Sequence, residues 1–292
     1  MANLKEIRNR IVSISSTRQI TSAMKMVSAA KLRRAQDAIT QMRPYSRKLQ
    51  EILENLSAGL DSSEGVYSQE REVKNVLFIS ITANRGLCGG YNNNVIKTVK
   101  KLADTEYKNC NVTIISIGKK SMDAFKLSPS AIKGKEIFSK SVEIIDNLNF
   151  ENTAEIAQTL MDEFAAKKQD KMVLVYNQFK NAAVQEIQVE QFLPVVPTTN
   201  ESKTSSSAEY IFEPNKEFII QELIPKSLKT QLFKALLDSQ ASEHGARMTA
   251  MHKATDNATD LINALKLSYN KARQASITNE ILEIVAGAEA LN

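Results

Sequence analysis

The sequence has no tryptophan and few residues that break helices or form cross-links: six prolines, nine glycines and two cysteines in 292 residues. Cys88 and Cys110 are too few for a disulfide framework, and neither stands in a C-x-x-C or metal-ligand pattern, so we expect two reduced thiols. No apolar run approaches the roughly 20 residues that a membrane-spanning helix needs. The start, MANLKEIRNRIVSISS, lacks the apolar segment and cleavage site of a secretory signal, which predicts an intracellular protein.

Charge is unevenly distributed along the chain. Residues 1–48 contain eleven Lys and Arg against only Glu6 and Asp37, a net charge of +9, whereas the whole chain carries +5. The remainder is therefore net acidic, at −4. A basic stripe of this kind predicts an acidic partner, which the residues alone leave open between nucleic acid, anionic lipid and acidic protein.

The N-terminal segment has the spacing of a long helix with a narrow apolar stripe. Residues 1–43 contain no glycine or proline, and Pro44 predicts a kink or a division of the helix. The stripe changes phase once, after its first four members. Its members are Leu4, Ile7, Ile11 and Ile14, then Ile20, Met24 and Val27, and later Ile39, Met42, Leu49, Ile52, Leu53 and Leu56.

The C-terminal segment has a heptad seam, and Gly245 is the only helix breaker between Lys226 and Ala286. A continuous helix there would have about 60 residues and a length of roughly 90 Å. The predicted seam consists of Ala254, Ala258, Leu261, Leu265, Ser268, Ala272, Ala275, Asn279, Leu282 and Ala286.

The middle of the chain alternates between short apolar runs and helical patterns. This alternation predicts a doubly wound, Rossmann-like α/β domain with a parallel sheet. Strands are expected near 74–82, 111–117, 172–176 and 184–192, with a weaker candidate at 135–139, and helices near 92–104, 119–126 and 152–167. The predicted segments are 1–58 (N-terminal coiled-coil helix), 59–209 (α/β domain) and 210–292 (C-terminal coiled-coil helix).

Size indicates how these parts are combined. A compact domain of about 150 residues has a diameter of roughly 40 Å, so it cannot cover a helix of roughly 90 Å. Because the two long helices stand at opposite ends of the chain, we expect them to form an antiparallel coiled coil that projects from the central domain.

The last turns of the C-terminal helix are apolar nearly all round. Besides the seam, the opposite side carries Ile277, Ile281, Ile284 and Val285. A helix that is apolar all round is normally buried. Either the N-terminal helix covers both faces of this end, or another protein surrounds it; the geometry of a two-helix contact favours another protein.

The segment NRGLCGGYNNN, residues 84–94, is a glycine-rich loop between a predicted strand and a predicted helix. It matches neither G-x-G-x-x-G nor the P-loop pattern, and no acidic residue follows the second strand to bind a ribose. We expect a structural or partner-contact loop. Cys88 has no evident base, and His244 and His252 have no further His or Cys nearby, so no catalytic, cofactor-binding or metal site is predicted.

Several segments together resemble a known family, the gamma subunits of the rotary F-type ATP synthases of bacterial type. They are IRNRIVSISSTRQITSAMKMVSAAKLRRAQ, RPYS, RGLCGG, ASEHGARMTAMHKATDNA and YNKARQASITNEILEIVAGAEAL, and they cover both terminal helices and the central loop. In that family the terminal helices form a shaft inside a ring of three alpha and three beta subunits. The α/β domain lies beside the epsilon subunit and the membrane c-ring.

The resemblance implies a non-catalytic rotor that couples proton or sodium flow to ATP synthesis or hydrolysis, peripheral to the plasma membrane on its cytoplasmic side. It implies that the basic first helix faces acidic loops of beta. It also implies partner contacts for individual residues. These are Met24, Lys25 and Met26 with beta; Gly86, Leu87, Cys88, Gly89 and Gly90 with the c-ring and epsilon; Arg273, Gln274 and Thr278 with a beta loop; and Ile277, Ile281, Ile284 and Val285 with an apolar sleeve.

Two other functions stay open from the residues. The first is a nucleotide-binding enzyme that uses the 84–94 loop, although the loop fits no nucleotide motif. The second is a basic coiled coil that binds nucleic acid through residues 1–48, although no aromatic residues are interleaved with the basic ones.

Overall fold

A computed structural model describes residues 4–57, 66–69, 71–128, 130, 143–195 and 216–289. Its elements in chain order are α1 (Leu4–Ser57), β1 (Asn75–Ile81), α2 (Tyr91–Thr105), β2 (Asn111–Ile117), α3 (Lys119–Phe125), α5 (Glu143–Asp146), α6 (Phe150–Ala165), β3 (Lys171–Phe179), β4 (Gln185–Leu193) and α7 (Lys216–Glu289). The chain divides into two units, the coil unit (1–28 with 247–292) and the sheet unit (29–246). The two long helices contribute to both units.

The sheet has the order β2-β1-β3-β4. β1 pairs in parallel with β2 and with β3, as predicted, whereas β4 runs antiparallel to β3. The reason lies in the connection, because only five residues separate β3 from β4 and a parallel crossover needs about a dozen. The four main predicted strands are confirmed, and the weaker candidate at 135–139 lies outside the described residues.

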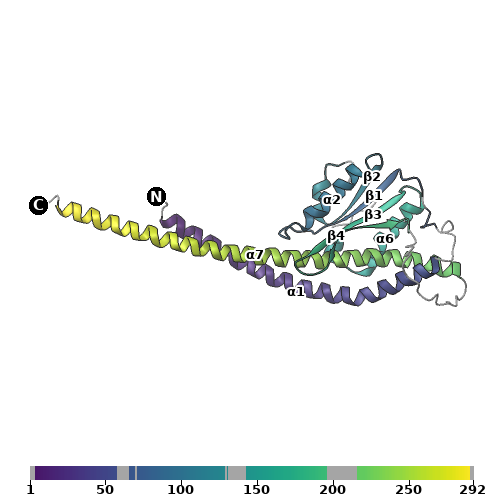
Figure 1. The fold of residues 1–292 in the computed structure, drawn as a ribbon, viewed down its shortest axis with the longest axis horizontal. Helices are drawn as coiled ribbons and strands as arrows, with labels where there is room; N and C mark the ends of the chain where they lie inside the picture. The colour runs from purple at the N-terminus through teal and green to yellow at the C-terminus, as the bar shows by residue number, and fades with distance from the viewer. Residues whose placement is uncertain are drawn as a thin grey trace. The chain divides into compact units, whose positions relative to one another are not determined.

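The sheet is covered on both faces (Figure 1). Leu77, Ile79 and Ile81 of β1 pack with α6 and with the part of α7 in this unit, while Val76 and Phe78 pack with α2 and α3. β1 is consequently buried along nearly its whole length, which explains why its sequence is a continuous apolar run rather than an alternating one. The division of the chain at residues 58 and 209 stays a prediction.

In the coil unit, α1 and α7 run antiparallel, because Thr21 contacts Thr255 and Lys25 contacts His252. The predicted phase shift in α1 is wrong. The buried and half-buried line continues in one heptad register through Arg18, Thr21, Lys25 and Ser28, while Ile20 and Val27 point outward, 60% and 58% exposed. Long cationic side chains can pack their aliphatic stems in a seam. The apolar pattern of the sequence therefore did not show where the seam of α1 lies. Pro44 does not divide the helix, since α1 runs through it.

The predicted seam of α7 is half right. Ala258, Leu265 and Ala272 face the partner helix, but the positions between them are shifted by one residue. Ile262 is buried at 5% exposure, whereas Leu261 is 49% exposed. Both are apolar, so spacing alone could not decide between them. By the same shift, the seam contains Tyr269 rather than Ser268, and Ser276 rather than Ala275. The observed seam residues are Met251, Thr255, Ala258, Ile262, Leu265, Tyr269, Ala272 and Ser276.

Gly245 does not interrupt α7, which is one helix of 74 residues. A Cβ at this position would lie 3.3 Å from the backbone of Ala182, in the turn between β3 and β4. The glycine therefore permits the close approach of this turn to the helix.

Candidate functional site

The glycine loop that joins β1 to α2 has an unusual backbone at two positions. Gly89 has φ +59°, which suits a glycine, and Leu87 has φ +61°, which for a side chain with a Cβ costs about 1 kcal/mol. The Leu87 side chain is also 64% exposed. An exposed leucine held in a costly conformation indicates a contact surface rather than a part of the core.

The buried amide of Asn92 organises this loop. Its Oδ1 accepts a hydrogen bond from the Ala83 N–H at 2.9 Å, and its Nδ2 donates to the carbonyl of Arg85 at 3.4 Å and to Cys88 Sγ at 3.1 Å. Cys88 is 1% exposed and packs with Ala83 and Tyr91. The Cys88 thiol is therefore a core group, not an accessible nucleophile, and any partner contact by Cys88 would involve its backbone.

Helix α7 fills the crevice at the carboxyl ends of β1 and β3, where open α/β sheets bind their ligands. The Tyr91 hydroxyl donates to the Ser239 carbonyl at 3.0 Å, and Ser242 Oγ donates to the Asn177 carbonyl at 2.9 Å. Asn177 Nδ2 in turn donates to the Tyr91 carbonyl at 3.1 Å. The cavity left beside Tyr91 and Ser239 measures about 10 Å³, which is room for one water at most and not for a nucleotide.

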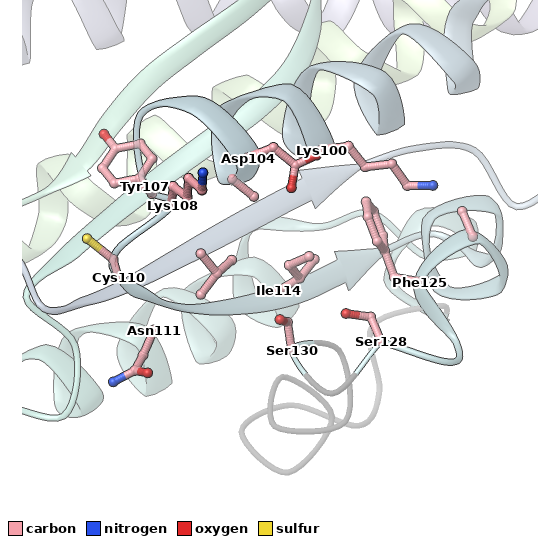
Figure 2. A pocket seen from close by; sticks show the side chains of 13 residues that line it. Lys100, Asp104, Tyr107, Lys108, Cys110, Asn111, Ile114, Phe125, Ser128 and Ser130 are labelled. Carbon is pink, nitrogen blue, oxygen red and sulfur yellow. The ribbon is translucent and has the colours of Figure 1, made fainter.

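A larger hollow of about 590 Å³ lies elsewhere, beside β2 and between α2 and α3 (Figure 2). Lys100, Asp104 and Lys108 contribute its charged groups, and Ile114 and Phe125 its apolar wall. Among the described residues, no group of three or more His, Cys, Asp or Glu could hold a metal ion. The hollow is therefore lined by both charged and apolar groups, and its described lining residues form no recognisable reaction centre.

The three sequence-predicted positions on α1 differ in their surroundings. Met24 is half-buried, and Met26 is 66% exposed. Lys25 is half-buried and its Nζ lies 3.2 Å from His252 Nδ1. Sequence reasoning missed an outward apolar row on the same helix, made of Val12, Ile20 and Val27. A heptad register carried through Arg18 and Thr21 would have revealed it.

The C-terminal end of α7 is uncovered among the described residues. Since Thr21 lies beside Thr255 and Lys25 beside His252, the antiparallel register places Leu4, the first described residue of α1, near residue 272. Residues 277–288 are all exposed, and Ile284 reaches 72%. The interpretation that the N-terminal helix covers this end is therefore wrong.

The predicted polar contact residues lie just before and within this end. Arg273, Gln274 and Thr278 are all exposed. The Thr278 hydroxyl donates to the Gln274 carbonyl at 2.9 Å, so its proton is used within the helix and its oxygen remains an acceptor. Positions 24–26 and 273–285 belong to the coil unit, and positions 86–90 belong to the sheet unit.

In the part of the chain that the structure describes, no helix is long and apolar enough to cross a membrane.

Comparisons with known proteins point to one family. A family model described as ATP synthase matches residues 3–291. The ATP synthase gamma chains of Christiangramia forsetii and Flavobacterium johnsoniae are each 61% identical to this chain, with complete coverage of both partners in each comparison. A solved structure titled as the central stalk and c-ring of the Tetrahymena thermophila mitochondrial ATP synthase is 26% identical, with a TM-score of 0.57, and the match covers 80% of this chain and 99% of that one.

Proposed function

The chain belongs to the ATP synthase family as a gamma chain, and we propose that it is the non-catalytic central stalk of an F-type ATP synthase. Its rotation would couple proton or sodium flow through a membrane c-ring to ATP synthesis or hydrolysis in a ring of three alpha and three beta subunits. A single rod that touches three equivalent catalytic sites differently can drive them through different conformations in turn.

The observation that carries this proposal is the uncovered end of α7. Ile277, Ile281, Ile284 and Val285 are each about half exposed or more, on a helix that has no intramolecular partner there among the described residues. Exposed apolar residues at this density mark a protein interface. We propose that they turn within an apolar sleeve of the alpha and beta subunits, where non-directional contacts allow rotation.

The remaining contacts follow from the same proposal. Arg273, Gln274 and Thr278 would bind a loop of beta, and Met24, Lys25 and Met26 would face beta from α1. The glycine loop, Gly86–Gly90, would contact epsilon and the c-ring; its exposed Leu87 side chain and strained backbone support this role. Basic residues of the segment 1–48 would face acidic loops of beta.

We also propose that the protein is peripheral to the bacterial plasma membrane, on its cytoplasmic side, through its complex. The bacterial origin of the similar gamma chains supports this placement. In the proposal the chain needs no cofactor of its own, because the catalytic sites belong to alpha and beta. The crevice filled by Tyr91 and Ser239 supports this assignment.

Substitution of Ile284 in the assembled complex tests the proposal. We expect Ile284→Glu to lower ATP-driven proton pumping by the purified complex, because an unpaired carboxylate is costly to bury in an apolar sleeve. Glu283→Gln is the matched control, since Glu283 is the exposed neighbour of Ile284 and the change adds no charge. Pumping and hydrolysis are measured together in inverted membrane vesicles.

Removal of residues 277–292 is the stronger form of the same test. We expect loss of assembly or of coupling. Normal assembly and coupling of the truncated complex would show that this end of α7 does not turn within an apolar sleeve. Purification of the chain as a monomer with its own nucleotide turnover would overturn the central-stalk assignment.

A further inference from the structure

We infer that Arg43 is a positioning residue for torque transmission. Its side chain joins α1 both to α7 and to the sheet, and we call these two contacts the Arg43 clip. This inference rests on the proposed central-stalk function. The Arg43 guanidinium lies 3.5 Å from Asp238 Oδ1 on α7. The same Nη2 atom donates to the carbonyl of Phe179, the last residue of β3, at 3.3 Å. One side chain therefore joins three elements of the sheet unit.

Asp238 makes this contact obligatory. Its side chain is 1% exposed, and neither of its oxygens accepts a hydrogen bond from any residue that the structure describes. Burial raises the pKa of this carboxyl group, and the positive charges of Arg43 and Lys234 oppose the rise. A buried carboxylate is tolerated only when a cation compensates it, so loss of the Arg43 charge would remove the cation that pairs with it directly.

A second acidic group makes the need for a cation greater. Glu190 on β4 accepts a hydrogen bond from the Tyr176 hydroxyl at 2.7 Å, and its negative charge contributes to the raised pKa of Asp238. The groups that face Asp238 are thus Arg43 from α1, Lys234 from its own helix, and Glu190 from β4. The guanidinium thus adds, from α1, a second positive charge to that of Lys234 on α7.

The clip differs in kind from the apolar contacts of α1 in this unit. Leu32, Ala35 and Ile39 are buried and apolar, and such contacts resist separation better than sliding. An ion pair combined with a hydrogen bond depends on direction and therefore also opposes sliding and twisting. The clip lies next to Pro44, where α1 lacks a backbone N–H and one helical hydrogen bond. It thus holds the helix next to a position where the backbone lacks a hydrogen bond.

The test uses the complete ATP synthase complex with Arg43→Met, Arg43→Lys, Asp238→Leu and the double variant Arg43→Met with Asp238→Leu. Two quantities are measured: the ratio of ATP-driven proton pumping to ATP hydrolysis, and the denaturant midpoint of the isolated chain. Lys168→Met is the control, because it removes an exposed ion pair with Glu163 in the same unit.

We expect Arg43→Met to lower both the ratio, by about twofold or more, and the midpoint. The double variant should recover the midpoint, because no buried charge remains, while its ratio stays low because the clip is gone. Arg43→Lys keeps the charge, but the shorter, flexible side chain lacks the planar guanidinium whose Nη2 lies between the two acceptors, so its ratio should fall as well.

Recovery of both quantities in the double variant would reduce Arg43 to a structural residue and overturn the inference. A ratio equal to wild type in Arg43→Lys and Arg43→Met complexes would also overturn it. If the wild-type complex itself neither pumps nor contains this chain, the central-stalk proposal fails instead, so the two failures are distinguishable.

Discussion

At the scale of single residues, the Asn92 side chain serves the glycine loop as a hydrogen-bond acceptor, as a bound anion does in a phosphate loop. A phosphate loop points its backbone N–H groups at the ligand. Here the Asn92 side chain accepts from one such N–H, that of Ala83, and donates to the Arg85 carbonyl and to the Cys88 sulfur. The loop is thus closed by its own chain, and Leu87 is left pointing outward.

Replacement of Asn92 by alanine should therefore destabilise the chain. The variant leaves the buried Ala83 N–H without its acceptor, and we expect a loss of about 1–3 kcal/mol in the free energy of unfolding. Denaturant titration of the purified chain measures it. Asn93→Ala is the control, because Asn93 is the exposed neighbour in the same helix. Equal stability of the two variants would show that Asn92 does not hold the loop.

A second prediction at this scale concerns pH and Asp238. Its folded-state pKa is raised above the ordinary value of 3.8, so between these two values the folded protein holds a proton that the unfolded chain has released. Stability from this group is therefore greatest at low pH and falls as the pH rises through the folded-state pKa. Asp238→Asn cannot ionise, so its stability relative to wild type should increase with pH.

Urea titrations at several pH values from about 4 to about 8 measure that difference. Glu186→Gln serves as the control, since Glu186 is a more exposed carboxylate paired with Lys180. A difference for Asp238→Asn that shrinks with rising pH would contradict the assigned direction.

At the scale of elements, the heptad register decides which side chains of the two long helices are interior. Seam positions in α1 include Arg18, Thr21, Lys25 and Ser28, and those in α7 include Thr255 and Ser276. Polar residues in a seam reduce the apolar area that the two helices bury against each other. The coil unit is therefore held with less hydrophobic energy than a leucine zipper of equal length would have.

The pair Leu261 and Ile262 tests this register directly. Ile262→Ala removes a buried side chain and should cost about 2–4 kcal/mol, whereas Leu261→Ala removes an exposed one and should cost about 0.5 kcal/mol or less. Thermal and denaturant unfolding of the two single variants make the comparison, and each is the control for the other. The reverse order of effects would restore the seam expected from the sequence.

At the scale of the whole molecule, large apolar side chains are exposed on both long helices. The outward row of Val12, Ile20 and Val27 on α1 repeats on a second helix the feature seen at the end of α7. Both groups of residues belong to the coil unit. Exposed apolar surfaces of this kind mark a protein interface.

We therefore expect Ile20→Asp to weaken assembly with the alpha and beta subunits without weakening the fold. Ile20 is 60% exposed, so the isolated chain should change by less than about 0.5 kcal/mol in its free energy of unfolding. Gln19→Ala, at an exposed neighbouring position, is the matched control. Yield of the purified complex and its ATPase activity measure assembly, and an unchanged yield would show that the row on α1 is not a contact surface.

By itself the sequence determined which elements exist and the family to which the chain belongs. The continuous apolar run of β1 and the long stretches without helix breakers were sufficient, because hydrophobic periodicity and backbone propensity are local properties. The motifs RGLCGG and KARQASIT were long enough to indicate the gamma-chain family, and the relatives confirm it.

Only the tertiary structure decided which of two adjacent residues faces inward and which distant side chains meet. Leu261 and Ile262 are equally apolar, and Arg43 and Asp238 are 195 positions apart, so neither choice is written in any local window. Burial depends on what the rest of the chain brings to a surface. For the same reason the exposure of Leu87, Ile20 and Ile284, on which the functional proposal depends, became visible only once the packing was known.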